Sequence, residues 1–275
     1  MKLTVLVENV AMENVRSAHG LSLYIETGAH TLLFDFGPDG DLLLENAEKL
    51  GADLEKVDAA FLSHGHYDHA GGLEAFLRVN SSASVYAHAL AFRPHLALKS
   101  GGLKSISADA TLPERYPERF VFTEGLWPVD ETLTLFSDVP GRELLSRANG
   151  SLFEEEGGRP VPDRFRHEQN LLIREGGTLT LVAGCAHRGI VNILRAAETA
   201  AGRAPDRVFS GFHLMNPDRG EDEPEAFVRA VGEALRAYPS LYGTGHCTGQ
   251  GPYRILQEQL GERLVYMGCG RRFEI

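Results

Sequence analysis

Residues 57–79, VDAAFLSHGHYDHAGGLEAFLRV, decide the fold of this chain. The segment begins with a mostly apolar run that is typical of a buried β-strand, and it ends with a run that predicts a helix. Between the two, residues 63–72, SHGHYDHAGG, place three histidines and an aspartate within six positions. A polar surface turn rich in histidine is the simple alternative. The order of strand, ligand-rich loop, two glycines and helix favours a metal site instead.

Composition limits the possible partners and compartments. The chain has 275 residues, 43% hydrophobic residues and a net charge of -11, which argues against a nucleic-acid-binding surface and against docking on an anionic membrane. No apolar run approaches the roughly 20 residues that a membrane-spanning helix needs. The N-terminal MKLTVLVENV lacks the apolar core of a signal peptide. Three cysteines, at 185, 247 and 269, make no disulfide framework, so we expect a cytoplasmic protein with reduced thiols. The sequence does not indicate an oligomeric state.

Strand-like and helix-like segments alternate along the chain, which indicates an α/β fold with layered sheets. We expect strands at 3–9, 21–27, 31–37, 57–63, 84–88, 207–213, 241–247 and 263–270, a hairpin at 170–184, and helices at 40–50, 71–79, 189–201, 224–238 and 251–260. Asp41 is the expected cap of the first helix. Residues 90–165 hold several prolines and glycines and predict a loop-rich insertion with one or two strands, at 120–123 and 132–136.

Four polar loops follow expected strands: SHGHYDH, GCAHRG, GFHL and GTGHCTG. Ligand sites of α/β folds gather at the carboxyl ends of strands. His64 and His66 are separated by one residue on an extended segment, so we expect their side chains to point the same way. A divalent ion such as zinc takes three or four N, O or S ligands, so four ligands on one loop can serve two ions. His187 and His246, both close to glycines, would complete the two ions.

HGHYDH resembles the H-x-H-x-D-H signature of the metallo-β-lactamase superfamily, and LLFDFG resembles the aspartate-bearing strand end that precedes it. Five further stretches are similar to one branch of that superfamily: AHGLSLYIE (18–26), EQNLLI (168–173), GCAHRGIVNIL (184–194), GFHL (211–214) and HCTG (246–249). This branch contains archaeal dihydropteroate-synthase-like enzymes and bacterial metal-dependent hydrolases. The resemblance covers nearly the whole chain.

The resemblance implies one domain over residues 1–275, an αββα sandwich of two mixed β-sheets flanked by helices, with the insertion at about 90–165. It also implies an enzyme with two divalent metal ions, zinc first and iron or manganese as alternatives. The metal ligands that the resemblance carries over are His64, His66, Asp68, His69 and His246. His187, two residues after Cys185, is the candidate for the remaining imidazole.

Two positions depart from the pattern of the hydrolytic members. Cys185 stands where those members have an aspartate that bridges the metals, and Glu168 falls near their expected histidine. Cys185 is a thiolate ligand or a small buried residue, and Glu168 is a ligand, a base or a surface carboxylate. Together with Asp68 and His213, these two residues are the candidate catalytic groups.

The candidate substrate-binding residues are His19, Arg142 and His213. His19 belongs to the stretch shared with the branch, although an ordinary loop histidine is the alternative. Arg142 would bind an anionic group through its guanidinium, with a solvated surface arginine as the alternative. His213 would line the substrate pocket, bind metal or pack. Asp35, at the end of LLFD, would orient a metal-bound histidine through its other ring nitrogen.

The function implied by the resemblance is that of a dinuclear metal-dependent transferase or hydrolase. Its substrate would be a small anionic molecule, pterin-diphosphate-like or a phosphoester. One alternative is a hydrolase of a phosphodiester, thioester or lactone that uses a metal-bound hydroxide. The other is a diiron redox or metal-binding protein, because two cysteines lie next to the expected site.

Overall fold

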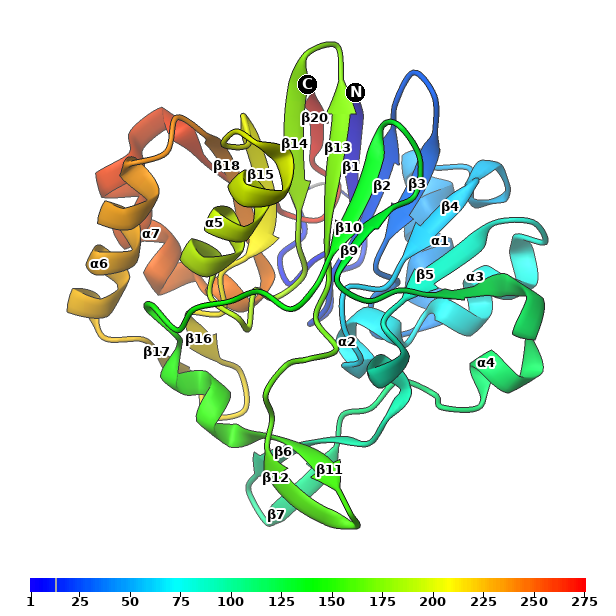
Figure 1. Ribbon diagram of the computed structural model, residues 1–275, viewed down its shortest axis with the longest axis horizontal. Coiled ribbons are helices and arrows are strands. Elements are labelled where there is room, and N and C mark those ends of the chain that lie inside the picture. The colour runs from blue at the N-terminus through cyan, green and yellow to red at the C-terminus, as the bar shows by residue number, and fades with distance from the viewer. Residues whose placement is uncertain (13) are drawn as a thin grey trace. The chain divides into compact units, whose positions relative to one another are not determined.

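The computed structural model describes residues 1–12 and 14–275 (Figure 1). These residues form two compact units, which are described separately. Unit 1 comprises Met1–His95, Ile106–Thr123 and Met267–Ile275, and unit 2 comprises Leu96–Ser105 and Glu124–Tyr266. Each unit contains a seven-stranded mixed sheet with flanking helices, which confirms the predicted fold class. None of the helices in the described ranges combines the length and the hydropathy of a transmembrane span.

The sheet of unit 1 has the strand order β20-β1-β2-β3-β4-β5-β8. These strands span Arg272–Glu274, Lys2–Val7, Ser22–Glu26, Thr31–Phe34, Ala59–Phe61, Ser84–Ala87 and Phe120–Phe122. The helices are α1 (Gly40–Leu50), α2 (Tyr67–Ala70), α3 (Leu73–Val79) and α4 (Leu112–Arg115), with 3-10 turns at Leu54–Lys56, Ala89–Phe92 and Pro117–Arg119. Strands β3, β4, β5 and β8 run parallel, while β20, β1, β2 and β3 pair antiparallel.

The sheet of unit 2 has the order β19-β18-β15-β14-β13-β10-β9. These strands span Leu264–Tyr266, Leu241–Gly245, Arg207–Gly211, Thr178–Val182, Asn170–Glu175, Leu133–Phe136 and Leu126–Pro128. The helices are α5 (Ile190–Ala201), α6 (Glu225–Arg236) and α7 (Gln250–Leu260), with 3-10 turns at Arg147–Ser151, His246–Thr248 and Gly261–Arg263. Strands β14, β15, β18 and β19 are parallel.

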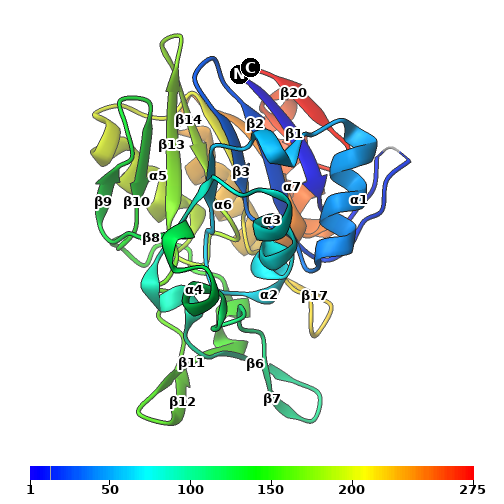
Figure 2. The same cartoon turned by 90° about the vertical axis from the view of Figure 1, so that its right-hand side faces the viewer.

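The remaining strands form two smaller sheets. One has the order β12-β11-β6-β7, with strands Arg159–Pro162, Leu152–Glu156, His95–Lys99 and Gly102–Ser105. The other is a ribbon of β16 (Met215–Asn216) and β17 (Glu221–Asp222). Figure 2 shows β6, β7, β11 and β12 as two projecting hairpins.

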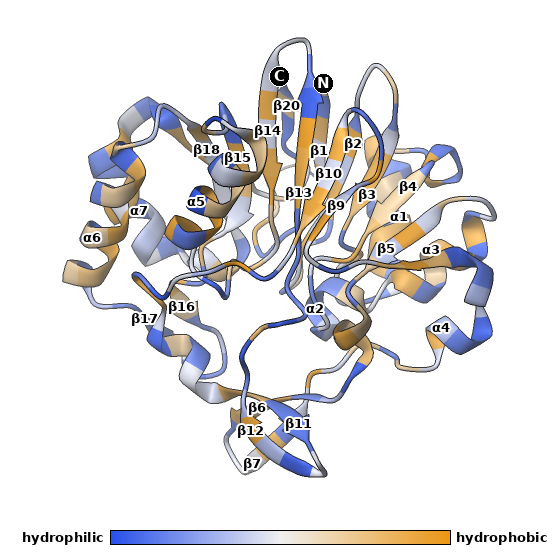
Figure 3. Cartoon of the chain, viewed as in Figure 1, coloured by the Kyte–Doolittle hydropathy of each residue, from blue (hydrophilic) through white to orange (hydrophobic). Residues whose placement is uncertain are grey.

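Each unit has its own apolar core. In unit 1, α1 and α3 bury Leu43 and Phe76 against the sheet. In unit 2, the apolar faces of α5 and α6 supply Ile193 and Val231, which pack with Val208 of β15. Figure 3 shows β10 and β13 mainly in orange and α6 in mixed colours, as expected for buried strands and an amphipathic helix.

Two expectations about the elements are wrong. Asp39, not Asp41, caps α1, because the Asp39 carboxylate accepts a hydrogen bond of 2.8 Å from the Leu42 N–H. Residues 90–165 hold the seven strands β6 to β12 rather than one or two. Of these, β8 joins the sheet of unit 1, and β9 and β10 join the sheet of unit 2.

The parallel strands bring the polar loops to one edge in each unit. In unit 1, Asp35 follows β3 and residues 63–69 follow β4. In unit 2, Cys185 follows β14, His213 follows β15 and His246 follows β18. The predicted placement of these loops at strand ends is confirmed within each unit.

Candidate metal centre

The loop after β4 and the short helix α2 carry four potential ligands in unit 1: His64, His66, Asp68 and His69, which are between 0% and 7% exposed. The His64 ring centroid lies 4.5 Å from that of His66 and 4.2 Å from that of His69. Gly65 allows the tight path, since a Cβ on it would lie 2.0 Å from the carbonyl oxygen of Ala91.

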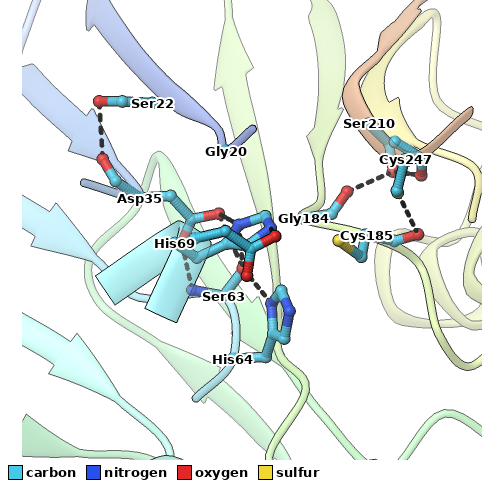
Figure 4. A network of polar contacts seen from close by, with 12 residues as sticks. Gly20, Ser22, Asp35, Ser63, His64, His69, Gly184, Cys185, Ser210 and Cys247 are labelled. Atoms are coloured by element: carbon cyan, nitrogen blue, oxygen red, sulfur yellow. Dashed lines mark hydrogen bonds and ion pairs between the residues drawn. The ribbon is translucent and has the colours of Figure 1, made fainter. Parts of the chain in front are cut away.

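A chain of hydrogen bonds fixes the orientation of two of these imidazoles (Figure 4). The Ser63 Oγ donates to Asp35 Oδ2 at 2.7 Å, so it accepts from His64 Nδ1 at 2.8 Å. His69 Nδ1 donates to the same Asp35 oxygen at 2.6 Å. Both rings therefore carry their proton on Nδ1 and their lone pair on Nε2, the atom with which a histidine oriented in this way binds a metal.

Asp35 is itself held firmly. It is fully buried and adopts a left-handed backbone with φ 60, which is uncommon for a residue with a Cβ. Its carbonyl accepts from Ser22 Oγ at 2.8 Å, and its Oδ1 accepts from the Ser63 N–H at 2.7 Å. The predicted contact between Asp35 and a histidine of the motif is confirmed, and Ser63 is a partner that the sequence reasoning missed.

His19 contacts the motif through Asp68. Asn9 Nδ2 donates to His19 Nδ1 at 3.2 Å, so the other ring nitrogen, Nε2, carries the proton and donates to Asp68 Oδ2 at 3.2 Å. His19 therefore orients the Asp68 carboxylate. Its side chain is 31% exposed, which leaves it accessible to a ligand as well.

Cys185 lies at the centre of a second cluster, in unit 2. Its sulfur is within 4.8 Å of donor atoms of His187, His213, His246 and Cys247. All five residues are buried, and His213 and His246 adopt left-handed backbones with φ 47 and φ 51. The pKa of the Cys247 thiol lies well below its usual value: burial would raise it, but the neighbouring Cys185 thiol and two imidazoles outweigh burial.

His187 is oriented by two residues that the sequence reasoning missed. Asn149 Oδ1 accepts from His187 Nδ1 at 3.1 Å, and Asn149 Nδ2 donates to the His187 carbonyl at 2.8 Å. The ring of Phe165 stacks on the imidazole at a centroid distance of 4.5 Å. The His187 lone pair is consequently on Nε2, as in His64 and His69.

Glu168 is buried, so of its three alternatives that of a surface carboxylate is wrong. Its two oxygens accept from the backbone N–H groups of His187 at 2.6 Å and of Arg188 at 2.9 Å. Burial raises the pKa of Glu168 to about 7, and the two backbone N–H groups oppose that rise. These contacts make Glu168 a support for the loop that carries His187.

One predicted residue, Arg142, and three polar residues that were not predicted, His95, Asp163 and His167, remain to be placed. Arg142 is exposed, and within the described part of the chain its side chain makes no hydrogen bond or ion pair. In unit 1 the ring of His95 lies 5.7 Å from that of His66. In unit 2 the His167 Nε2 lies 3.3 Å from the Asp163 Oδ2, and both side chains are buried. The four-residue spacing of Asp163 and His167, next to Glu168, is the sequence signal that could have found this pair.

Both clusters fit a divalent metal ion. In unit 1 the donors are buried imidazoles, two of them with the lone pair on Nε2, and the Asp68 carboxylate, which suit zinc, iron and manganese. In unit 2 the donors are buried imidazoles and two thiols, which suit zinc. Such groups are costly to bury without partners, and metal coordination is one way in which proteins satisfy them.

Comparisons with known proteins agree with this chemistry. The model of the metallo-beta-lactamase superfamily matches residues 18–199. The chain is 27% identical over 285 residues to a 7,8-dihydropterin-6-methyl-4-(beta-D-ribofuranosyl)-aminobenzene-5'-phosphate synthase of Methanocaldococcus jannaschii, with 98% of this chain and 95% of that one covered. An uncharacterised protein of the same archaeon is 26% identical over 248 residues, which covers 89% of this chain and 90% of that protein.

Solved structures show the same fold. The crystal structure of Tm1679, described as a metal-dependent hydrolase of the beta-lactamase superfamily, has a TM-score of 0.83 and 26% identity, and the match covers 100% of this chain and 99% of that one. An isothiocyanate hydrolase from Delia radicum gut bacteria, at 14% identity, a TM-score of 0.59 and coverage of 100% and 99%, shares the fold alone. Since the superfamily model matches more than half of its residues, this chain belongs to the metallo-β-lactamase superfamily and is a metal-dependent enzyme of the hydrolase or synthase type.

Proposed function

We propose that this protein is a dinuclear metal-dependent enzyme that acts on a small anionic substrate, pterin-diphosphate-like or a phosphoester. The proposed ligands are His64, His66, Asp68, His69, His187 and His246, with zinc as the metal. The observation that carries the proposal is the hydrogen-bond chain through Ser63 and Asp35, which sets the lone pairs of two adjacent buried imidazoles on Nε2. We further propose a single domain over residues 1–275 and a cytoplasmic location.

The substrate class is supported by similarity to the archaeal synthase along 98% of this chain. When bound, two divalent ions would supply the positive charge that holds an anionic group and stabilises a departing diphosphate. Cys185 occupies the position at which hydrolytic members carry a bridging aspartate. Condensation of a pterin diphosphate with an arylamine needs no activated water, so this replacement favours transfer over hydrolysis.

The residues of the chain have separate tasks in this proposal. His19 orients Asp68 through the contact of 3.2 Å. Glu168 supports the loop of His187 through its two backbone hydrogen bonds. Arg142 and His19 would contact the substrate, since one is an exposed cation and the other is a partly exposed histidine beside the motif.

The test combines metal content with an assay of condensation between a dihydropterin diphosphate and an aminobenzoate-type amine. We expect at least two equivalents of zinc, iron or manganese per chain and a condensation product. The His66→Ala variant should bind fewer metal equivalents and form no condensation product. His30→Ala, which changes a histidine outside the clusters that contacts Asp58, should keep the full metal content and the product. Less than one metal equivalent in the unmodified protein, or condensation that survives in His66→Ala, would contradict the proposal.

Hydrolysis is the second candidate. It is favoured by the likeness to Tm1679, a metal-dependent hydrolase that matches the whole chain at 26% identity. The discriminating measurement is cleavage of bis-p-nitrophenyl phosphate. If the unmodified protein cleaves this substrate but forms no condensation product, and His66→Ala does not cleave it, the reaction is hydrolysis rather than transfer.

A further inference from the structure

Unit 2 holds a group of metal-binding side chains that the six proposed ligands leave unused: Cys185, His213 and Cys247. The two sulfur atoms and one ring nitrogen of His213 all lie within 4.8 Å of one another. The three residues are only 3%, 5% and 2% exposed. They follow β14, β15 and β18, three neighbouring parallel strands, so the sheet itself fixes their spacing.

The buried ring nitrogens of His213 indicate that this group binds a ligand. Both of its ring nitrogens are buried, and among residues 1–12 and 14–275 neither has a hydrogen-bond partner. Buried polar atoms in native proteins are nearly always satisfied by protein, water or a ligand. Its backbone is also left-handed, at φ 47. A conformation of this kind persists where the surroundings fix it, and it is concentrated at ligand sites.

Gly211 provides the space that the Cys247 sulfur occupies. A Cβ on Gly211 would lie 2.5 Å from Cys247 Sγ and 3.6 Å from the Cys185 Cα. The Gly211 N–H donates to the Gly184 carbonyl at 2.8 Å, which holds the backbone next to the thiol. Cys247 Sγ also approaches the Cys185 carbonyl to 3.5 Å (Figure 4). The two thiols are therefore packed side by side by the backbone of three loops.

We propose that Cys185, Cys247 and His213 form a thiolate-rich site for a thiophilic metal ion of the zinc class. This site would adjoin the dinuclear centre of the proposed function, because the Cys185 sulfur also lies within 4.8 Å of donor atoms of His187 and His246. Two thiolates and one imidazole are soft donors that zinc prefers, and three protein ligands leave a fourth position for an exchangeable ligand. Binding replaces the two S–H bonds by S–metal bonds and releases two protons. This site gives His213 the role of a ligand in place of the substrate contact expected from the sequence.

Cadmium NMR of the full chain loaded with Cd²⁺ tests the site, because each bound ion gives its own resonance and every sulfur ligand shifts that resonance downfield. We expect one resonance in the range of two-sulfur sites. It should disappear or move upfield in Cys247→Ser, since one of the two sulfurs is removed. It should stay in Cys269→Ser, the matched control, because Cys269 is a buried thiol of unit 1 that contacts the Leu6 carbonyl at 3.0 Å.

A His66→Ala variant separates this site from the proposed function. The two-sulfur resonance should persist there, while a resonance of the nitrogen and oxygen ligands is lost. The spectrum of the unmodified protein tests the proposal even if Cys247→Ser does not fold. Absence of a two-sulfur resonance from that spectrum overturns the proposed site. An unchanged resonance in a folded Cys247→Ser variant, which would mean that Cys185 alone binds, overturns it as well.

Discussion

Ser63 and Asp35 connect the two imidazoles whose lone pairs the proposed metals require. The Asp35 carboxylate accepts three hydrogen bonds, from the Ser63 N–H, the Ser63 hydroxyl and His69 Nδ1. Partners of this kind fix the tautomer and the rotation of a metal-binding histidine. A single carboxylate therefore controls the direction of both rings.

We expect Asp35→Ala to lower the zinc affinity by about 10- to 100-fold, because His69 loses its acceptor and Ser63 loses the group that keeps it an acceptor for His64. The measurement is competition for zinc with a chromophoric chelator. Asp58→Ala is the matched control, since Asp58 contacts His30 Nδ1 at 3.2 Å in the same kind of pair. Equal zinc affinities in Asp35→Ala and Asp58→Ala would show that the hydrogen bonds through Ser63 and Asp35 do not orient the metal ligands.

Asn149 is the corresponding partner in unit 2. We expect Asn149→Ala to weaken binding of the ion at His187 by about 10-fold, because the Nδ1 proton then loses its acceptor. Asn149→Asp keeps an acceptor oxygen and should restore most of the affinity. Zinc retained after dialysis, measured by elemental analysis, distinguishes the variants. Failure of the aspartate to restore binding would mean that Asn149 acts only through its bond to the His187 carbonyl.

Among the elements, the start of α1 tests how much an N-capping side chain contributes to stability. We expect Asp39→Ala to lower the free energy of unfolding by about 1 kcal/mol, because the Leu42 N–H loses its side-chain acceptor. Asp41→Ala, in the first turn of the same helix, should change it by no more than about 0.5 kcal/mol. Urea unfolding measures both, and a larger loss in Asp41→Ala would contradict the observed cap.

The sequence predicted the long periodic elements and missed the short ones, for physical reasons. Helices such as α5 and α6 repeat apolar residues every three or four positions, so their boundaries were predicted to within about two residues. Strand β9, Leu126–Pro128, has three residues, all exposed, and contains a proline. It carries no period-two pattern, and only pairing with β10 makes it a strand.

At the scale of the molecule, the site was predictable where one segment carries the whole signal. Four potential ligands lie on residues 64–69 alone, and the family pattern predicted that Asp35 orients a histidine, which the structure shows to be His69. Asn149 and Phe165 reach His187 from segments that are distant in sequence, so no local pattern reveals them. The surroundings of Cys185 were likewise unpredictable, because they depend on the alignment of three parallel strands.

Metal binding should stabilise the whole chain, since the unfolded chain holds no preformed site. At a free zinc concentration of 100 times the dissociation constant, we expect the free energy of unfolding to rise by about 2.7 kcal/mol for each independent ion. Thermal unfolding of chelator-treated protein, with and without zinc, measures the gain. His66→Ala should show a smaller gain and His30→Ala the full one, because only the former removes a proposed ligand. Equal gains in the unmodified protein, His66→Ala and His30→Ala would mean that zinc binds elsewhere on the chain, and would contradict the assignment of the ligands in residues 64–69.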